Sequence, residues 1–207
     1  MKHLAYNILC FVMLCNVHLV NAQGDVKIGK QTWMSKNLDV STFRNGEQIP
    51  QAKDIEQWKY AGTNKIPAWC YYEFNESNGK KYGKLYNWYC IKDARGLAPK
   101  GYHIPSDAEW TILTDFLGGS AGKKMKSKDG WEDNGNGDNI SRFNGLPGGD
   151  CYNDGYFSRM TAFGYFWSSS EDDGDYAWFR GLRYDRTTVS RDGNVKSGGM
   201  SVRCLRD

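Results

Sequence analysis

The sequence predicts an α+β domain with one or two helices, short antiparallel strands and long ordered loops. Residues 101–110 specify one helix start in detail. Most other apolar residues fall in short runs bounded by turn residues, which is typical of strands. Glycine, asparagine and aspartate dominate residues 131–149, which favours ordered turns. A length of 207 residues is that of a single domain.

Residues 1–22 have the pattern of a secretory signal peptide. Lys2 precedes an apolar run over 8–15, and residues 20–22 provide a cleavage site after Ala22. The run is too short to span a bilayer, and the alternatives to a signal peptide are an uncleaved anchor or a buried strand. We therefore expect a mature domain over 23–207, secreted or held at the cell surface, with no transmembrane span.

The first half of the mature chain reads as strands and loops. Two short strands around a glycine turn are expected over 26–34, and Asn45-Gly46 predicts another turn. Residues 51–66 read as irregular, with Trp58 and Tyr60 as isolated anchors.

An aromatic-rich region follows. A strand is expected to start at 69–72, and residues 75–79 read as a loop. The run over 82–90 is dense in aromatic side chains and fits either a helix or an extended segment.

A helix is predicted to start at Asp107, because Ser106 and Glu109 have the spacing of a capping box. Pro105 restricts the preceding residue to an extended conformation, which sharpens this start. Glycine at position 118 is typical of a helix end, so the helix should run to about Leu117. The expected core face consists of Trp110, Leu113, Phe116 and Leu117. A second short helix is expected over 121–126.

The C-terminal part predicts further strands. Alternating or aromatic runs predict strands over 165–170 and 176–184. Asp192-Gly193 is typical of a hairpin turn, between short strands at 187–189 and 195–196. The last strand is expected over 201–204.

Charge and histidine content argue against two classes of function, nucleic-acid binding and histidine-based catalysis. The net charge of +3 falls by one when Lys2 leaves, which is too little for a nucleic-acid-binding surface. His103 is the one histidine beyond the leader, whereas Ser-His-Asp and Cys-His devices need a histidine base. We interpret His103 as structural and bonded to backbone, and we predict no catalytic residues and no enzyme activity.

Cys70, Cys90, Cys151 and Cys204 remain after the leader is removed. An even number of cysteines in an exported chain predicts two disulfides, with three possible connectivities. No two of them have the close spacing of zinc ligands.

A set of motifs occurs in a fixed order along the mature chain. They lie at 28–38, 82–89, 99–110, 117–119, 143–149, 166–171 and 201–204. This set resembles the Fibrobacter succinogenes major paralogous domain, a family of exported bacterial proteins. The resemblance covers nearly the whole mature chain.

The resemblance implies a C-type lectin-like fold, which formylglycine-generating enzymes share. Cys70 and Cys204 match positions where the family usually has cysteine, which implies pairs 70–204 and 90–151. Formylglycine-generating activity needs two reactive cysteines near the C-terminus, but Cys204 stands alone there.

Two acidic segments, 132–139 and 171–175, offer oxygen ligands for calcium. Gly135 and Gly137 stand where an EF-hand needs ligands, and the calcium signatures of lectins are missing. Hydrated turns are the interpretation that we prefer. We expect no cofactor, with calcium as the alternative.

We predict a non-catalytic binding or cell-surface interaction module whose loops, over about 129–176, recognise a glycan or a protein. The candidate ligand-binding residues are Trp131, Asp133, Asn134, Tyr152, Tyr156, Glu171, Asp172 and Tyr176. The alternatives are a degenerate oxidoreductase or hydrolase related to formylglycine-generating enzymes, and a displayed receptor with diversified strands over 167–204.

Overall fold

Two sheets organise the chain in the computed structural model, which describes residues 24–207. The smaller sheet has the order β1-β2-β12-β5, and the larger has the order β10-β9-β8-β6-β11-β4-β3, with β7 beside β6. The pairs are antiparallel except β6 with β8. The predicted signal peptide, including its cleavage site, lies outside the described residues. The α+β class is confirmed.

The strands of the smaller sheet are β1 (Asp25–Ile28), β2 (Gln31–Met34), β12 (Leu205–Arg206) and β5 (Tyr102–His103). The strands of the larger sheet are β10 (Ser190–Val195), β9 (Tyr176–Arg183), β8 (Phe163–Glu171), β7 (Phe157–Met160), β6 (Gly148–Cys151), β11 (Gly199–Met200), β4 (Leu85–Asn87) and β3 (Trp69–Cys70). The helices are α1 (Ile55–Thr63), the 3-10 turn η1 (Tyr72–Phe74), α2 (Glu76–Tyr82), α3 (Trp88–Lys92), α4 (Asp107–Leu117) and α5 (Ala121–Met125).

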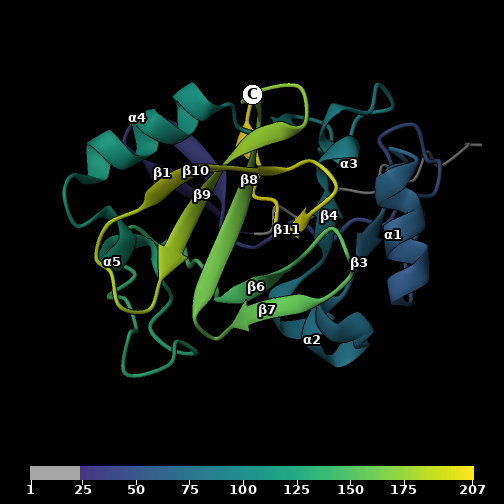
Figure 1. The fold of residues 1–207 in the computed structure, drawn as a ribbon. Helices are drawn as coiled ribbons and strands as arrows, with labels where there is room; N and C mark the ends of the chain where they lie inside the picture. Colours follow the sequence, from purple (N-terminus) through teal and green to yellow (C-terminus); the bar gives the residue numbers. More distant parts are fainter. Residues whose placement is uncertain (1–23) are drawn as a thin grey trace, which may run out of the picture.

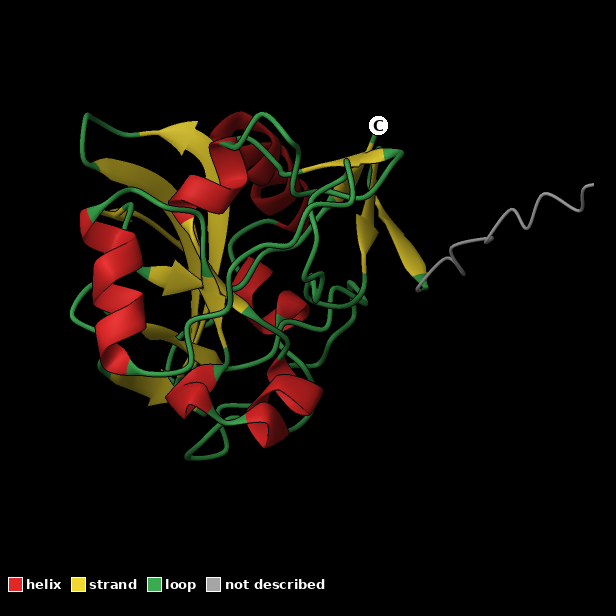
Figure 2. Cartoon of the chain, turned by 90° about the vertical axis from the view of Figure 1, so that its right-hand side faces the viewer, coloured by secondary structure: helices red, strands yellow, loops and turns green. Residues whose placement is uncertain are grey.

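The helices cover different sides of the larger sheet. In Figure 1, α4 and α5 lie on the left and α1 on the right, with β8 and β9 between them. The start of the described chain and the C-terminus lie on the same side of the molecule (Figure 2), because β12 pairs with β2.

The predicted start of α4 is confirmed. Ser106 Oγ accepts from the backbone N–H of Glu109, and the Glu109 carboxylate accepts from the backbone N–H of Ser106. Gly118 ends the helix with a φ of 74°, a conformation that glycine adopts without strain. The predicted second helix is α5, and the predicted strands over 26–34 are the β1–β2 hairpin.

Phe116 is a correction to the predicted core face of α4. Trp110, Leu113 and Leu117 are buried, but Phe116 is 64% exposed. It lies at the margin of the apolar stripe, where the helix faces the turn of the β1–β2 hairpin. The Phe116 ring lies 3.0 Å from where a side chain at Gly29 would begin.

Two segments expected to be irregular or loop are helical. Residues 51–66 contain α1, which begins because the Asp54 side chain accepts from the backbone N–H of Gln57 at 2.8 Å. Residues 75–79 open α2, where Asn75 caps in the same way. The ambiguous aromatic run over 82–90 divides into β4 and α3.

Near the C-terminus, the predicted strands over 165–170 and 176–184 are confirmed as β8 and β9. The predicted turn at Asp192-Gly193 is wrong, because both residues lie inside β10 and pair with Phe179 and Trp178 of β9. The last strand is β12 rather than 201–204, where Ser201 forms only an isolated bridge.

Aromatic side chains fill much of the core. Trp33 and Trp110 lie with ring centroids 4.7 Å apart, and Phe143 contacts both. Each such ring removes a large apolar surface from water, which offsets the scarcity of aliphatic residues.

The expected disulfides are not formed in the described structure. All four cysteines are buried free thiols. Cys70 and Cys151 are neighbours in one core cluster, whereas Cys90 and Cys204 belong to a different one. The pairing 70–204 with 90–151 is therefore not the arrangement found. The reason lies in the sheets, since β3 and β6 carry Cys70 and Cys151 in the larger sheet, whereas Cys204 leads into the smaller one.

Candidate functional site

An open cleft lies between α1, η1 and the turn that joins β6 to β7. We call it the Tyr156 cleft. Its volume is about 580 Å³, and its lining residues are Lys53, Asp54, Ile55, Glu56, Glu73, Phe74, Gly155, Tyr156 and Phe157. The three segments are far apart in sequence, so only the folded chain creates the cleft.

Helix α1 is held against the β6–β7 turn by two contacts. The indole N–H of Trp58 donates to the backbone oxygen of Tyr152 at 2.9 Å. Gly155 has a φ of 84°, and a side chain there would begin 3.0 Å from Ile55. Glycine at position 155 thus allows both the turn and the close approach of the helix.

Aromatic rings form one wall of the cleft. Phe74 and Phe157 meet edge to face, with ring centroids 4.8 Å apart. The side chain of Tyr156 is 63% exposed. Glu73 and Phe74 have φ angles of 56° and 51°, a conformation that costs on the order of 1–3 kcal/mol for each non-glycine residue. The strained turn places the Glu73 carboxylate and the Phe74 ring at the cleft.

Two carboxylates, those of Glu56 and Glu73, also line the cleft. The Glu56 side chain is 85% exposed, and its ion pair with Lys59 at 3.8 Å is a weak surface contact. The Glu73 side chain makes no hydrogen bond or ion pair within residues 24–207. Both carboxylates are therefore available to accept hydrogen bonds from a ligand.

A second cleft adjoins the first across Glu56. It has a volume of about 600 Å³, and Tyr60 and Ile66 are among its lining residues. Tyr60 is 65% exposed. Two open clefts with exposed tyrosines thus lie on either side of one carboxylate.

The structure distributes the predicted binding residues over several places. Tyr156 lines the cleft, and Tyr152 lies half-buried in the same turn. Trp131 is a correction, because it is buried and its indole N–H donates to Ser127 Oγ at 2.9 Å. It belongs to the core rather than to a ligand surface.

Asp133 and Asn134 are exposed in a turn, with φ angles of 49° and 57°. Glu171, Asp172 and Tyr176 lie around the β8–β9 turn, where Asp172 N–H donates to the Tyr176 oxygen. Among the described residues, no hydrogen bond or ion pair joins these two groups to each other or to the Tyr156 cleft.

Side chains of both acidic segments make hydrogen bonds within the protein. Asp173 Oδ1 accepts the backbone N–H groups of Asp175 and Tyr176. Glu132 accepts from the Thr161 hydroxyl. Within residues 24–207, no group of three or more histidine, cysteine or acidic side chains is arranged to hold a metal ion.

His103 is bonded to side chains rather than to backbone. Its ring nitrogens lie 2.8 Å from Asp207 Oδ1 and 3.0 Å from Glu109 Oε1. Burial lowers the pKa of His103, but the hydrogen bonds to Asp207 and Glu109 outweigh it and leave the pKa raised. Since Glu109 also caps α4, this histidine ties the helix start to the end of the smaller sheet.

The cysteine thiols are poorly suited to act as nucleophiles or redox groups. Burial raises the pKa of Cys204 to about 12. Burial also raises the pKa of Cys90 and that of Cys151, where the Cys70 thiol adds to the effect. Reactive cysteines need a lowered pKa and access to solvent, and these buried cysteines lack both.

No helix within residues 24–207 has the length and apolar character needed to cross a bilayer.

The model of the Fibrobacter succinogenes major domain matches residues 26–206. The chain belongs to this family. No curated protein and no solved structure matches it. In this Fibrobacter succinogenes major domain, the matched region includes both sheets and all segments of the Tyr156 cleft.

Sequence reasoning missed Glu56, Tyr60, Glu73 and Phe74 in this family member. Asp54 followed by Gln57 was a usable helix-start signal, and it would have placed Glu56 and Tyr60 on one exposed helix. Nothing local in the sequence indicates the strained turn at Glu73 and Phe74.

Proposed function

We propose that this domain is an exported, non-catalytic module that binds a glycan in the Tyr156 cleft. The observation that carries the proposal is the exposed Tyr156 ring beside the Glu56 and Glu73 carboxylates in a cavity of about 580 Å³. A sugar presents an apolar face and a rim of hydroxyls, which match an aromatic ring and hydrogen-bond acceptors.

The adjoining cleft around Tyr60 supports an extended ligand. The two clefts share Glu56, so a chain of sugars could contact Tyr156 and Tyr60 at once. The strained backbone at Glu73 and Phe74 also fits a binding role, because such strain gathers at ligand sites.

Two observations support a role without catalysis. Burial raises the pKa of the Cys90, Cys151 and Cys204 thiols, which opposes the thiol chemistry of formylglycine-generating enzymes. His103, the one histidine among the described residues, is engaged by Asp207 and Glu109. A secreted or cell-surface location and a C-type lectin-like fold belong to the same proposal. The sequence pattern of residues 1–22 supports the first, and the pairing of β2 with β12 is in keeping with the second.

A glycan array with the natively processed protein tests the proposal. We expect a defined set of glycans to bind, and Tyr156→Ala to raise their Kd at least tenfold. Glu56→Gln should weaken binding by less, since one hydrogen bond to a charged group is lost. Tyr176→Ala is the matched control, because Tyr176 is 42% exposed on a different turn.

Two results would overturn the proposal. One is an array without any bound glycan together with capture of a protein partner that depends on Tyr156. The other is glycan binding that Tyr176→Ala abolishes and Tyr156→Ala leaves intact.

A further inference from the structure

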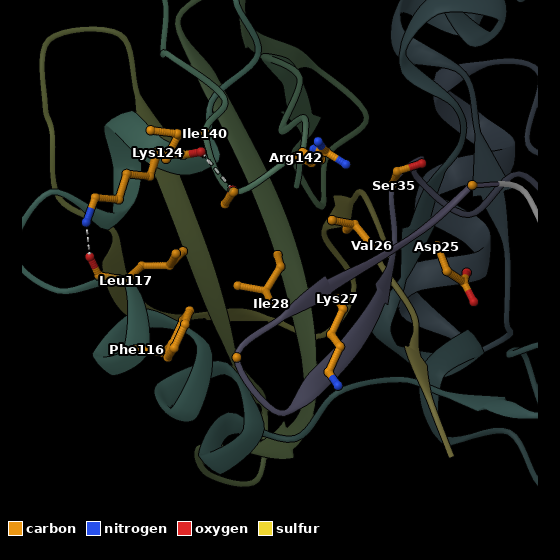
Figure 3. A pocket seen from close by; sticks show the side chains of 13 residues that line it. Asp25, Val26, Lys27, Ile28, Ser35, Phe116, Leu117, Lys124, Ile140 and Arg142 are labelled. Carbon is orange, nitrogen blue, oxygen red and sulfur yellow. Dashed lines mark hydrogen bonds between the residues drawn. The ribbon is translucent and has the colours of Figure 1, made fainter.

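Another open cavity lies away from the Tyr156 cleft, beside β1. We call it the β1 groove. Its volume is about 880 Å³, and it is bounded by β1, the end of α4 and residues 140–142. Figure 3 shows Val26 and Ile28 pointing from β1 into this space, with Phe116 and Ile140 around it.

Apolar side chains around the β1 groove are left uncovered. Phe116 is 64% exposed and Ile140 is 71% exposed. Ile112, one turn before Phe116 on α4, is 55% exposed and extends the apolar surface along the helix. A gathering of large apolar side chains of this kind marks an interaction surface more often than a lone exposed residue does.

Strand β1 is also an open sheet edge. Among the strands of residues 24–207 it pairs with β2 alone, and Val26 and Ile28 stand opposite Trp33 and Gln31 around a two-residue turn. In an antiparallel ladder with this register, the backbone N–H and C=O groups of Asp25 and Lys27 point outward. Within residues 24–207 they have no hydrogen-bond partner, so they can pair with another extended chain.

The charges beside the β1 groove are positive. Arg142 and Lys27 are exposed, and neither forms an ion pair with any residue that the structure describes. The Asp25 carboxylate is already occupied, because Arg206 and the Tyr102 hydroxyl both bond to it. The carboxylates of a partner could therefore pair with Arg142 or Lys27, and the Asp25 carboxylate, already bonded, would not compete for them.

We propose that the β1 groove binds an extended, acidic peptide segment of another protein, which adds a strand to the edge of β1. Alternate side chains of such a strand point to opposite faces, so one set would pack on Phe116 and Ile140. The acidic side chains would lie on the opposite face of the added strand, beside Lys27, and the Arg142 guanidinium adds positive charge on the groove side that favours an acidic segment. This site is independent of the Tyr156 cleft and of any glycan.

An array of eight-residue peptides tests the proposal with the natively processed protein. Valine or isoleucine fills every second position, and glutamate, serine or lysine fills the others. We expect the glutamate series to bind most tightly and the lysine series not to bind. Methylating the backbone nitrogens on the edge that faces β1 should abolish binding, because a new strand needs those donors.

Variants assign the binding to the β1 groove. The double variant Lys27→Glu with Arg142→Glu should raise the Kd of the glutamate peptides at least tenfold, and Phe116→Ser should raise it severalfold. The matched control is Lys65→Glu with Lys100→Glu, two exposed lysines away from the groove. All these side chains are at the surface, so circular dichroism should show folded variants.

Several results would overturn the proposal. They are no binding in any peptide series, equal binding of the glutamate and lysine series, and binding that backbone methylation leaves unchanged. Dimerisation in sedimentation that the charge-reversal variant abolishes would instead assign the edge to a second copy of this chain.

Discussion

Arg203 Nη2 donates a 2.7 Å hydrogen bond to Asn37 Oδ1, which joins two buried residues 166 positions apart. Arg203 also donates to the backbone oxygens of Met34 and Phe143, and its guanidinium lies over the Phe143 ring. Burial without a carboxylate partner lowers the pKa of Arg203 to about 9, which still leaves it charged at neutral pH. The Arg203 side chain thus connects the end of β2 and the residues after it to the loop at Phe143.

Replacing Arg203 by methionine should destabilise the protein strongly. The change removes the donors for three buried acceptors, and each buried group left unpaired costs about 1–3 kcal/mol. We expect a loss of at least about 3 kcal/mol in the free energy of unfolding, measured by urea denaturation. Arg206→Met is the control, because Arg206 is half exposed and its solvent-screened ion pair should contribute little to stability. Equal losses in the two variants would contradict this account.

The burial of Asp150 should make the free energy of unfolding fall as pH rises. Burial raises the pKa of Asp150 to about 6, and its Oδ1 has no hydrogen-bond partner among the described residues. The unfolded chain releases this proton near pH 4 and the folded chain near pH 6. Stability is therefore lost as pH rises through this window, by up to about 3 kcal/mol.

Asp150→Asn tests this prediction because it removes the titration and keeps the shape. The variant and the parent should be similarly stable at pH 4, and the variant should be more stable at pH 7. A constant difference in the free energy of unfolding across this range would show that Asp150 does not titrate as described.

His103 should affect stability at higher pH. Its pKa in the folded protein is raised above the ordinary value of 6.5, so its contribution is complete below that pH. The contribution is lost as pH rises through the raised folded pKa. We expect the parent to lose more unfolding free energy between pH 6 and 9 than His103→Gln does. Parallel curves for the two proteins would refute the role of the Asp207 and Glu109 contacts.

The contact between Cys70 and Cys151 predicts which disulfide forms on oxidation. After exposure of the folded protein to a mild oxidant and alkylation of its free thiols, mass spectrometry should find a Cys70–Cys151 bond, with Cys90 and Cys204 left as thiols. Such a bond closes a loop of roughly 80 residues, worth at most about 4.5 kcal/mol in the chain-entropy model. Cys70→Ser should then lower the melting temperature more under oxidising than under reducing conditions, whereas Cys204→Ser should act equally in both. A Cys70–Cys204 bond would contradict the fold at this point.

Local signals predicted the elements that local physics specifies. The start of α4 needs only Ser106, Glu109 and their backbone, so its sequence pattern sufficed. By contrast, Asp192-Gly193 has the sequence of a turn but lies in β10, because pairing with β9 outweighs local preference. The strands β6 and β7 carry little apolar pattern and were not predicted, since their pairing depends on distant residues.

The candidate binding residues also differ in whether the local sequence could predict them. Tyr156 could be chosen because an aromatic residue in a glycine-rich turn is often exposed, and the structure places it in a cleft. Trp131 fits the same description but is buried, because Ser127 and the surrounding core enclose it. The rest of the cleft, from Glu56 to Phe74, could not be predicted because separate segments meet there only after folding.

The position of β12 has a consequence for biogenesis. This strand is inserted between β2 and β5, so the sheet that begins at residue 25 is completed only by residues 205–206. A polypeptide that leaves a ribosome or a translocation channel from its amino end cannot finish this sheet until almost the whole chain has emerged. Late completion makes acquisition of the native state sensitive to small truncations at the carboxyl end.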